Sequence, residues 1–574
     1  MIREKSDITN IEIEGKNGPE YYHQKIKMWS FDGVLGPVLF VSILLIFLSA
    51  FRPLALPDEA RYAEIGRWMW ESGDWLVPRL NGIPFFHKPP LLYWLGGIAN
   101  SVTGPSAWFF RLIPVTHAVL ILALMGPFLC ETLGVIFARK AVLIFGSSAA
   151  FLLGGQYINH DMMVACWINV AIGSFGWHVM HCDPISSASI EDKAITNKSV
   201  PLLGFFGCGM GVLSKGLIGV VLPLAVMFVW LCWCGRWYAL KRLPWVSGLL
   251  VFIFIAFPWF AVVESKYPGM LSYMFGIHQL ARFTGTQFNN PQPFWFYLVA
   301  ISLLMGPWFL GFWVHQYQNL YEILRSTSGF KERCESFLNE FKWEKQNQIK
   351  SEELLIGLCV IWVWVIVIFF SIPSSKIIGY VLPVIAPICV LCVRGWDRLT
   401  EQTRIKHFFY KGMFVLSLGV VVLIQIQAAV ITNRYASVDV AKVLSCQDLS
   451  NAKILIAGEY AYDLPFLMNL KTPLWVVQNW DNERIHAGDN WRREMFEGVN
   501  FEPQTSSVLK PMYALATESK VSDRWLLIPK EWAAKPMVEN FGYVLEYKGQ
   551  AWSLYRSPLT HSIKFDVTGS CLKQ

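Results

Sequence analysis

The chain has 574 residues, of which 54% are hydrophobic and 16% are charged, and its formal net charge is +7. Soluble globular proteins average about 25% charged residues, so the composition excludes an ordinary soluble protein and favours a polytopic membrane protein. The 26 Trp suit aromatic belts at the membrane interfaces. The basic residues punctuate apolar runs and do not form one patch, which argues against nucleic-acid binding.

Apolar runs of roughly membrane-spanning length recur along the first three quarters of the chain. The first 30 residues are polar and no small-residue cleavage site follows the first run, so we expect that run to stay as an anchor. We predict eleven membrane helices, at 33–51, 107–129, 138–155, 161–180, 200–214, 217–234, 245–263, 294–314, 354–371, 378–393 and 409–431.

Lys and Arg set the orientation of these helices. If the N-terminus lies inside, the inside connections hold far more Lys and Arg than the outside ones, and the odd number of spans puts the C-terminal region outside. We therefore predict a mostly α polytopic membrane protein with a C-terminal soluble α/β domain. Its parts are a cytoplasmic segment 1–32, a membrane region 33–431 with a first outer loop 53–106, and a periplasmic region 432–574.

Smaller elements follow from local patterns. Two amphipathic stretches of the first outer loop, 58–72 and 90–101, predict helices at the membrane interface, and the charged connection 317–352 predicts a cytoplasmic helix. In the C-terminal region, strands are expected at 453–460, 473–478, 524–530 and 543–556, and helices at 463–470 and 530–541. Cys446 and Cys571 fall in a region whose predicted compartment permits disulfides, so they are the candidates for one.

The sequence LPDEARYAEIGRW places several ionisable residues directly after the first apolar run. Asp58 and Glu59 follow Pro57 at a helix start, where carboxylates cap the helix and complement its dipole. Tyr62 lies one turn after Asp58 on the same face. Such crowding of charge at a membrane surface is also typical of a functional site, so both interpretations stay open.

Other polar clusters fall between spans on the same outer side. Lys88 follows His87 before a Pro pair, and it could snorkel or bind a phosphate as a point charge. Asp161 opens the fourth span, either as a cap or as a cavity acid. Lys215 lies among glycines that allow close helix packing, so its charge should face protein or a polar cavity.

Two further pairs lie at i, i+4 spacing: His278 with Arg282, and Lys376 with Tyr380. Together the outer clusters supply cations and carboxylates on one face of a membrane protein. Cations can bind a phosphate leaving group beside a carboxylate base. A lipid-linked phosphate would account for the membrane setting.

These motifs, in this order, resemble the GT-C membrane glycosyltransferases. They are PDEARYAEI, SGDWLVPRLNG and KPPLLYWL in the first loop, then HDMM, SKGLIG, the H-x-x-x-RF loop with QPFWFY, and SSKIIGYVLP. More narrowly, the chain resembles the aminoarabinose transferases, which are relatives of the protein O-mannosyltransferases. The resemblance covers about residues 30–430.

The resemblance implies that a polyprenyl-phosphate sugar donates its sugar to an acceptor on the periplasmic face, in the bacterial inner membrane. It implies that Asp58 is the carboxylate at the reaction centre and Asp161 a second catalytic acid. The implied ligands of the lipid phosphate are Lys88, Arg282, Lys376, Tyr380 and Lys215. The implied cavity or acceptor residues are Glu59, Tyr62, His87 and His278.

The sequence constrains the metal and the acceptor less than it constrains the sugar donor. In this family a Glu commonly precedes the first-loop Lys and can bind metal with the later His, whereas this chain has His87 there. The pair His87 and His278 is therefore the candidate for a divalent metal, and no other cofactor is expected. The acceptor is a glycolipid such as lipid A, or a protein, as in the O-mannosyltransferases. A transporter of a lipid-linked sugar is a further alternative, but no repeat or paired broken helix is visible.

Overall fold

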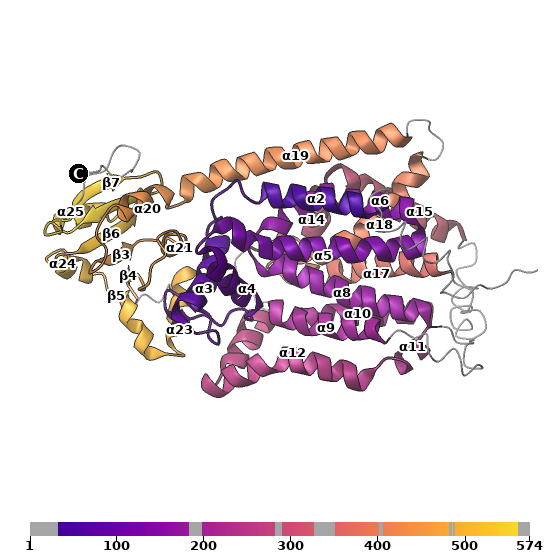
Figure 1. Ribbon diagram of the computed structural model, residues 1–574, viewed down its shortest axis with the longest axis horizontal. Helices are drawn as coiled ribbons and strands as arrows, with labels where there is room; N and C mark the ends of the chain where they lie inside the picture. The colour runs from indigo at the N-terminus through magenta and orange to yellow at the C-terminus, as the bar shows by residue number, and fades with distance from the viewer. Residues whose placement is uncertain are drawn as a thin grey trace, which may run out of the picture.

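The computed structural model describes residues 33–182, 198–281, 290–326, 350–400, 406–480 and 490–560, together with 485 and 488. It is an elongated helical bundle with a sheet at one end (Figure 1). Each predicted apolar run is helical. The bundle elements are α2 (Leu35–Leu48), α5 (Ala107–Leu133), α6 (Val135–Ser147), α7 (Ala149–Leu152), η1 (Gly154–Gln156), α8 (His160–His181), α9 (Ser199–Lys215), α10 (Ile218–Cys234), α11 (Tyr238–Lys241), α12 (Trp245–Lys266), η4 (Ser272–Leu280), α14 (Phe296–Met305), η5 (Gly306–Trp308), α15 (Phe309–Ser326), α17 (Ser351–Ser371), η7 (Ile378–Val384), α18 (Ile385–Thr400) and α19 (Lys406–Tyr435).

The bundle has the helices of a multi-pass membrane protein. Among the described residues, seven helices are apolar and long enough to cross a membrane, and α6 with α7 adds an eighth as a bent pair. The shorter apolar helices α2, α9 and α10 fall on three of the remaining predicted runs. Within its most apolar window α8 is 78% buried, whereas α19 is only 17% buried. The helix α8 is therefore central, and α19 presents its apolar side chains outward.

Glycines let α9 and α10 approach each other closely, as their sequence predicts. A Cβ atom on Gly219 would lie 2.3 Å from the carbonyl carbon of Gly211, far inside van der Waals contact. Small residues at such crossings allow backbones to pack in membranes. This contact fixes the position of Lys215, which is the last residue of α9.

The first outer loop forms the predicted helices α3 (Asp58–Ser72) and α4 (Leu91–Thr103). They pack against each other and beneath the C-terminal region, and their position at the membrane interface stays a prediction. The backbones meet where a Cβ on Gly66 would lie 2.9 Å from the Cα of Gly96. A hairpin of β1 (Arg79–Leu80) and β2 (Ile83–Pro84) joins them. Its Asn-Gly turn has positive φ at both residues, the strongest short hairpin signal, which the sequence analysis missed.

The C-terminal region is a six-stranded sheet in the order β5-β4-β3-β6-β8-β7, with short helices. The first four strands in this order are parallel, and β8 and β7 extend the sheet antiparallel. Each predicted strand is confirmed, with 543–556 divided into two, and β5 was not foreseen. The elements are α20 (Val438–Ser445), β3 (Lys453–Ala457), α21 (Leu464–Leu467), β4 (Trp475–Val477), α23 (Trp491–Val499), η8 (Pro503–Val508), β5 (Leu509–Lys510), α24 (Ala514–Glu518), β6 (Arg524–Pro529), α25 (Lys535–Asn540), β7 (Val544–Lys548) and β8 (Trp552–Arg556).

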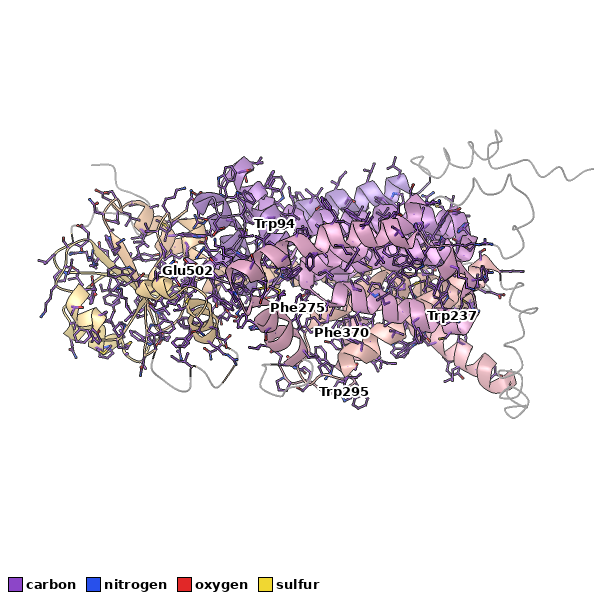
Figure 2. All side chains as sticks on the ribbon, turned by 90° about the horizontal axis from the view of Figure 1, so that it is seen from below. Trp94, Trp237, Phe275, Trp295, Phe370 and Glu502 are labelled. Carbon is purple, nitrogen blue, oxygen red and sulfur yellow. The ribbon has the colours of Figure 1, made fainter. Side chains whose placement is uncertain are left out.

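The two faces of this sheet are covered differently. Ile456 and Leu527 belong to the same buried cluster as Ile65 of α3, whereas Leu455 and Leu526 face a separate small core. One face of the sheet is therefore continuous with the core of the outer loop. In Figure 2 Glu502 lies where the sheet region meets the bundle, and Trp237 lies toward the opposite end. Cys446 is disulfide-bonded, and Cys571, its predicted partner, lies outside the described residues.

We expect Gly219→Ala to destabilise the protein by about 1–3 kcal/mol, because the added methyl forces α9 and α10 apart. Thermal unfolding in detergent measures this. Gly412→Ala is the matched control, since nothing lies within 4 Å of the added Cβ in α19, and its stability should match or slightly exceed that of the wild type. Equal midpoints for the two variants would contradict the close helix contact.

Candidate active site

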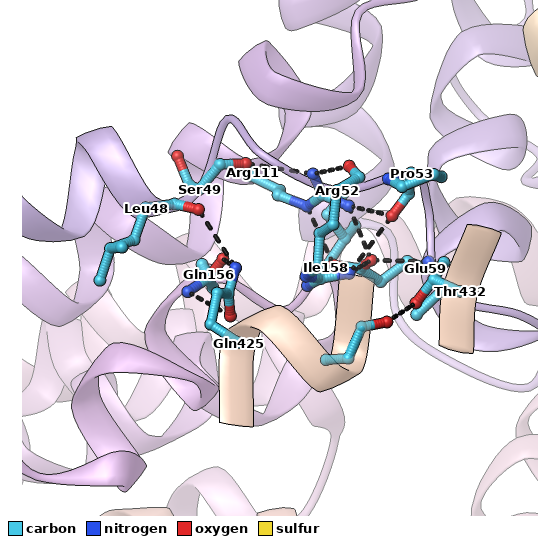
Figure 3. A network of polar contacts seen from close by, with 12 residues as sticks. Leu48, Ser49, Arg52, Pro53, Glu59, Arg111, Gln156, Ile158, Gln425 and Thr432 are labelled. Atoms are coloured by element: carbon cyan, nitrogen blue, oxygen red, sulfur yellow. Dashed lines mark hydrogen bonds and ion pairs between the residues drawn. The ribbon is translucent and has the colours of Figure 1, made fainter. Parts of the chain in front are cut away.

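A buried carboxylate, Glu59, organises the base of the outer loop (Figure 3). Its side chain is fully buried and forms ion pairs with Arg52 and with Arg111, whose Nη2 lies 3.0 Å from Oε2. The backbone N–H groups of Ala55 and Ile158 donate to the same carboxylate at 2.8 and 3.1 Å. Burial raises the pKa of Glu59, but the two guanidinium groups outweigh burial and lower it to about 2.

This network connects four segments of chain. Glu59 begins α3, Arg52 precedes it, Arg111 lies on α5, and Ile158 leads into α8. Arg111 also donates to the carbonyl of Ser49 at 3.1 Å. The carboxylate of Glu59 is enclosed by these partners, and its predicted role at the cavity or acceptor stays a prediction.

Asp58 differs from its neighbour. Its side chain is 46% exposed and forms a loose ion pair with Arg61, in which the charged atoms lie 3.6 Å apart. It makes no side-chain capping bond to α3, so the capping interpretation is not supported. Burial and the charges of Asp58 and Glu59, with a contribution from Asp161, raise the pKa of Tyr157. Asp58 and Asp161 are therefore both within electrostatic reach of the same tyrosine.

Asp161 forms an ion pair with Lys215, so two of the predicted site residues are in direct contact. Asn159 caps α8, accepting from the backbone N–H of Asp161 at 2.9 Å and donating to its carboxylate at 2.8 Å. The cap is thus Asn159, and the carboxylate of Asp161 is turned to Lys215. The Lys215 ammonium also lies 4.4 Å from the centre of the Tyr380 ring.

His160 links this ion pair to the first loop. Its ring makes an edge contact with Tyr62, with centroids 4.8 Å apart. Lys88 and Lys215 both lie within electrostatic reach of the buried His160 ring. Residues from the first loop, α8 and α9 are therefore brought to one place, as the shared outer orientation predicted.

Lys376 is buried, and its ammonium group is hydrogen-bonded to backbone carbonyl groups. It is 4% exposed, and its ammonium donates to the carbonyls of Gln292 at 2.9 Å and Pro373 at 2.5 Å. The hydroxyl of Tyr297 donates to the carbonyl of Ile377 nearby, at 3.2 Å. These contacts join the segments before α14 and η7. Arg282, the other predicted phosphate ligand of this part of the chain, lies outside the described residues.

A second cluster lies beside Lys88 and contains both predicted metal ligands. The rings of His87 and His278 are 3.9 Å apart between centroids. Glu497 joins them from α23, with its Oε2 3.8 Å from Nε2 of His278. Tyr273 donates its hydroxyl to the same oxygen at 2.8 Å and contacts Nε2 of His87 at 2.9 Å. Two imidazoles and a carboxylate are a donor set that suits a divalent transition metal.

The C-terminal region supplies the outer wall of this site through α23 and η8. Glu494 accepts a hydrogen bond from Arg61 at 2.7 Å, directly beside Asp58. Glu502 lies 2.8 Å from Arg79 and accepts from Tyr267 at 3.3 Å. The sequence analysis missed Glu494 and Glu497, since hundreds of residues separate them from their partners and no local motif marks them.

The sequence profile of the dolichyl-phosphate-mannose-protein mannosyltransferase family matches residues 33–274. The undecaprenyl phosphate-alpha-4-amino-4-deoxy-L-arabinose arabinosyl transferase 1 of Proteus mirabilis is 30% identical over 369 residues, or 62% of this chain and 59% of that enzyme. The corresponding transferase of Aeromonas salmonicida is 30% identical over 66% of this chain and 63% of its own length.

The crystal structure of ArnT from Cupriavidus metallidurans bound to undecaprenyl phosphate superposes with a TM-score of 0.69. The alignment covers 91% of this chain and 98% of that one, at 19% identity. The chain resembles the aminoarabinose transferases and has their fold. The resemblance and the GT-C fold expected from the motifs are thus confirmed. The chain spans about 60% of the length of the two curated transferases named above.

We expect Glu59→Gln to cost about 3–5 kcal/mol, because it leaves two buried guanidinium groups without their counter-charge. Glu71→Gln is the control. It removes the Glu71 ion pair with Lys471, whose side chain is 64% exposed, and should cost less than about 1 kcal/mol. Thermal unfolding and the yield of monodisperse protein in detergent report the difference. Similar losses in both variants would show that the network does not organise the loop.

Proposed function

We propose that this protein is an integral-membrane glycosyltransferase that moves a sugar from a polyprenyl-phosphate donor to an acceptor at the periplasmic face. The observation that carries the proposal is the exposed carboxylate of Asp58 at the start of α3. On the same helix Tyr62 packs against His160, the residue before Asp161 of the Asp161–Lys215 pair. The similarity to aminoarabinose transferases supports the same reaction. The acceptor we favour is lipid A or a related envelope glycolipid.

In this reaction Asp58 acts as the general base. It takes the proton from the acceptor hydroxyl as that oxygen attacks the anomeric carbon of the sugar, with inversion. The bond from the anomeric carbon to the phosphate oxygen breaks, and the polyprenyl phosphate leaves with the bonding electrons. An ionised carboxylate in reach of solvent can accept that proton, and nearby cations stabilise the charge on the leaving phosphate.

The phosphate is assigned first to Lys88, with Arg282 as the second predicted ligand. Lys88 is half-buried and lies between His87 and the helix α4. The charge of Lys215 is balanced by Asp161, so this pair is better suited to orient Tyr380 and the sugar than to bind the phosphate alone. Lys376 holds two carbonyls, and we assign it to shaping the segment before Tyr380.

A divalent metal would be held by His87 and His278 with Glu497. When bound there it would supply a Lewis acid next to Lys88, at the end of the site that receives the phosphate. Tyr273 would hold the carboxylate of Glu497 in place. The proposed reaction requires the proton acceptor Asp58 and the cations whether or not the metal is bound.

A protein acceptor is the second candidate, because the matched sequence profile is that of a protein mannosyltransferase family. The placement of the chain in the membrane is the same for both acceptors. Residues 1–32 would lie in the cytoplasm, residues 33–431 in the membrane and residues 432–574 in the periplasm. The disulfide at Cys446 supports the placement of the last region in an oxidising compartment. We accordingly place the protein in the bacterial inner membrane.

We expect Asp58→Asn to lower transfer about 10²–10⁴-fold, since an amide cannot accept the proton. Mass spectrometry of lipid A and of envelope proteins, from cells that express the wild type or the variant, measures transfer and identifies the acceptor. Asp74→Asn is the control, because Asp74 lies on the same loop and binds the backbone of Leu76. Near-wild-type transfer by Asp58→Asn, at equal protein level, would exclude the assigned base. Sugar on proteins alone would exclude the glycolipid acceptor.

We expect a membrane-impermeant thiol reagent to label Cys446 and Cys571 in spheroplasts only after reduction, because both thiols are oxidised in the periplasm. A cysteine introduced at Tyr513, which is 73% exposed on the C-terminal region, should label without reduction. Mass spectrometry of the tail peptides reads out both. Failure of the introduced cysteine to label in spheroplasts would contradict a periplasmic C-terminal region, and labelling of the native pair before reduction would contradict the disulfide.

A further inference from the structure

We propose that Glu497 is the third protein ligand of a divalent metal ion, of the zinc class, that fastens the C-terminal region to the outer loop at the active site. The proposal extends the proposed function, because His87 adjoins Lys88. Its test measures metal binding and not sugar transfer, so the two can fail separately.

The three donors come from three distant segments. His87 lies in the outer loop, His278 on η4, and Glu497 on α23 of the C-terminal region. One donor atom from each lies within 4.8 Å of the other two. Among the described residues this is the one group of three His, Cys, Asp or Glu side chains found at such spacing. Both imidazoles are at most 9% exposed, so the cluster is enclosed.

The donor set and its spacing fit zinc with a small closure. Zinc–ligand bonds of about 2.0–2.2 Å place two ligand atoms about 3.3 Å apart at a tetrahedral angle. The Glu497 oxygen and the His278 nitrogen are already 3.8 Å apart. Three protein ligands also leave the fourth position of a tetrahedral site open. That position could be taken by an oxygen of water or of a phosphate.

The surrounding groups hold the ligands as metal sites require. Arg493 donates to Oε1 of Glu497 at 2.6 Å, which leaves Oε2 turned to the histidines. The Tyr273 hydroxyl has one proton, and when it donates to Glu497 the contact with His87 requires Nε2 of His87 to donate to it. The lone pair of a neutral His87 ring is then on Nδ1. Hydrogen bonds that orient ligands in this way are a regular part of protein metal sites.

The π-helix η4 explains how both aromatic partners reach the cluster. In this helix the hydrogen bonds run from i to i+5. Tyr273 and His278 are five residues apart, and their ring centroids lie 4.6 Å from each other. Insertions of this kind occur often at functional sites. An α-helix would turn these two side chains to different faces.

The neighbouring Glu502 provides a matched comparison. Like Glu497 it is a carboxylate of the C-terminal region that binds an arginine and a tyrosine hydroxyl at the same junction, Arg79 at 2.8 Å and Tyr267 at 3.3 Å. Among the described residues, the group with metal-ligand spacing does not include Glu502. Loss of Glu502 should therefore weaken the junction without affecting metal binding.

The experiment uses the full chain purified in detergent and treated with a chelator, then titrated with Zn²⁺. We expect about one zinc per chain by elemental analysis and a rise in the unfolding midpoint on zinc addition, because a ligand that binds only the folded state stabilises it. Glu497→Gln should weaken zinc binding at least about 10–100-fold, the cost seen for lesser changes around metal ligands. Glu502→Gln should bind zinc as the wild type does.

Two further variants distinguish the loss of a metal ligand from a folding defect. Glu497→Asp keeps the charge and should retain part of the affinity, and His87→Gln removes a ligand from the opposite side of the junction and should lose binding as Glu497→Gln does. Wild-type zinc affinity in Glu497→Gln would overturn the proposal, because zinc would then bind without the Glu497 carboxylate. Equal loss of zinc binding in Glu497→Gln and Glu502→Gln would also overturn it, by showing that only the intact junction matters.

Discussion

The buried ion pairs of Glu59 with Arg52 and Arg111 hold the outer half of this protein together. The carboxylate also accepts from the backbone before α8, so one side chain sets the position of α3 relative to α5 and α8. Charges buried in this way are costly to separate. The geometry of the site depends on this fixed contact, since Asp58 directly precedes Glu59 in α3 and Asp161 is at the start of α8.

The charged residues of α3 are divided between support and chemistry. Glu59 and Glu64 are enclosed by arginines, whereas Asp58 is half exposed. Arg61 donates a hydrogen bond to Glu494 and Arg67 donates one to Asn469, so α3 also binds the C-terminal region. A hydrophobic protein gathers charges at this point because one short helix connects the bundle, the site and the sheet region.

Much of the fold follows from local sequence. The apolar runs are helices, α3 begins at the expected Asp58, and the strands at 453–460 and 524–530 are found because both faces of a mostly parallel sheet are buried and need continuous apolar residues. The two-residue strand β5 carries too little pattern to be foreseen. The π-helix was not foreseen either, because the i, i+4 pairing of His278 with Arg282 suggested an ordinary helix.

The sequence by itself determined the membrane class, the helices and the set of polar residues that gather on one side, because hydrophobicity and periodicity act over short stretches of chain. Only the tertiary structure decided which of two adjacent acids is buried and which is exposed, since a helix turns Asp58 and Glu59 about 100° apart and the packing of α5 and α8 selects between them. It likewise decided that Glu497 reaches His87 and His278, because contacts between segments hundreds of residues apart depend on how the whole chain packs.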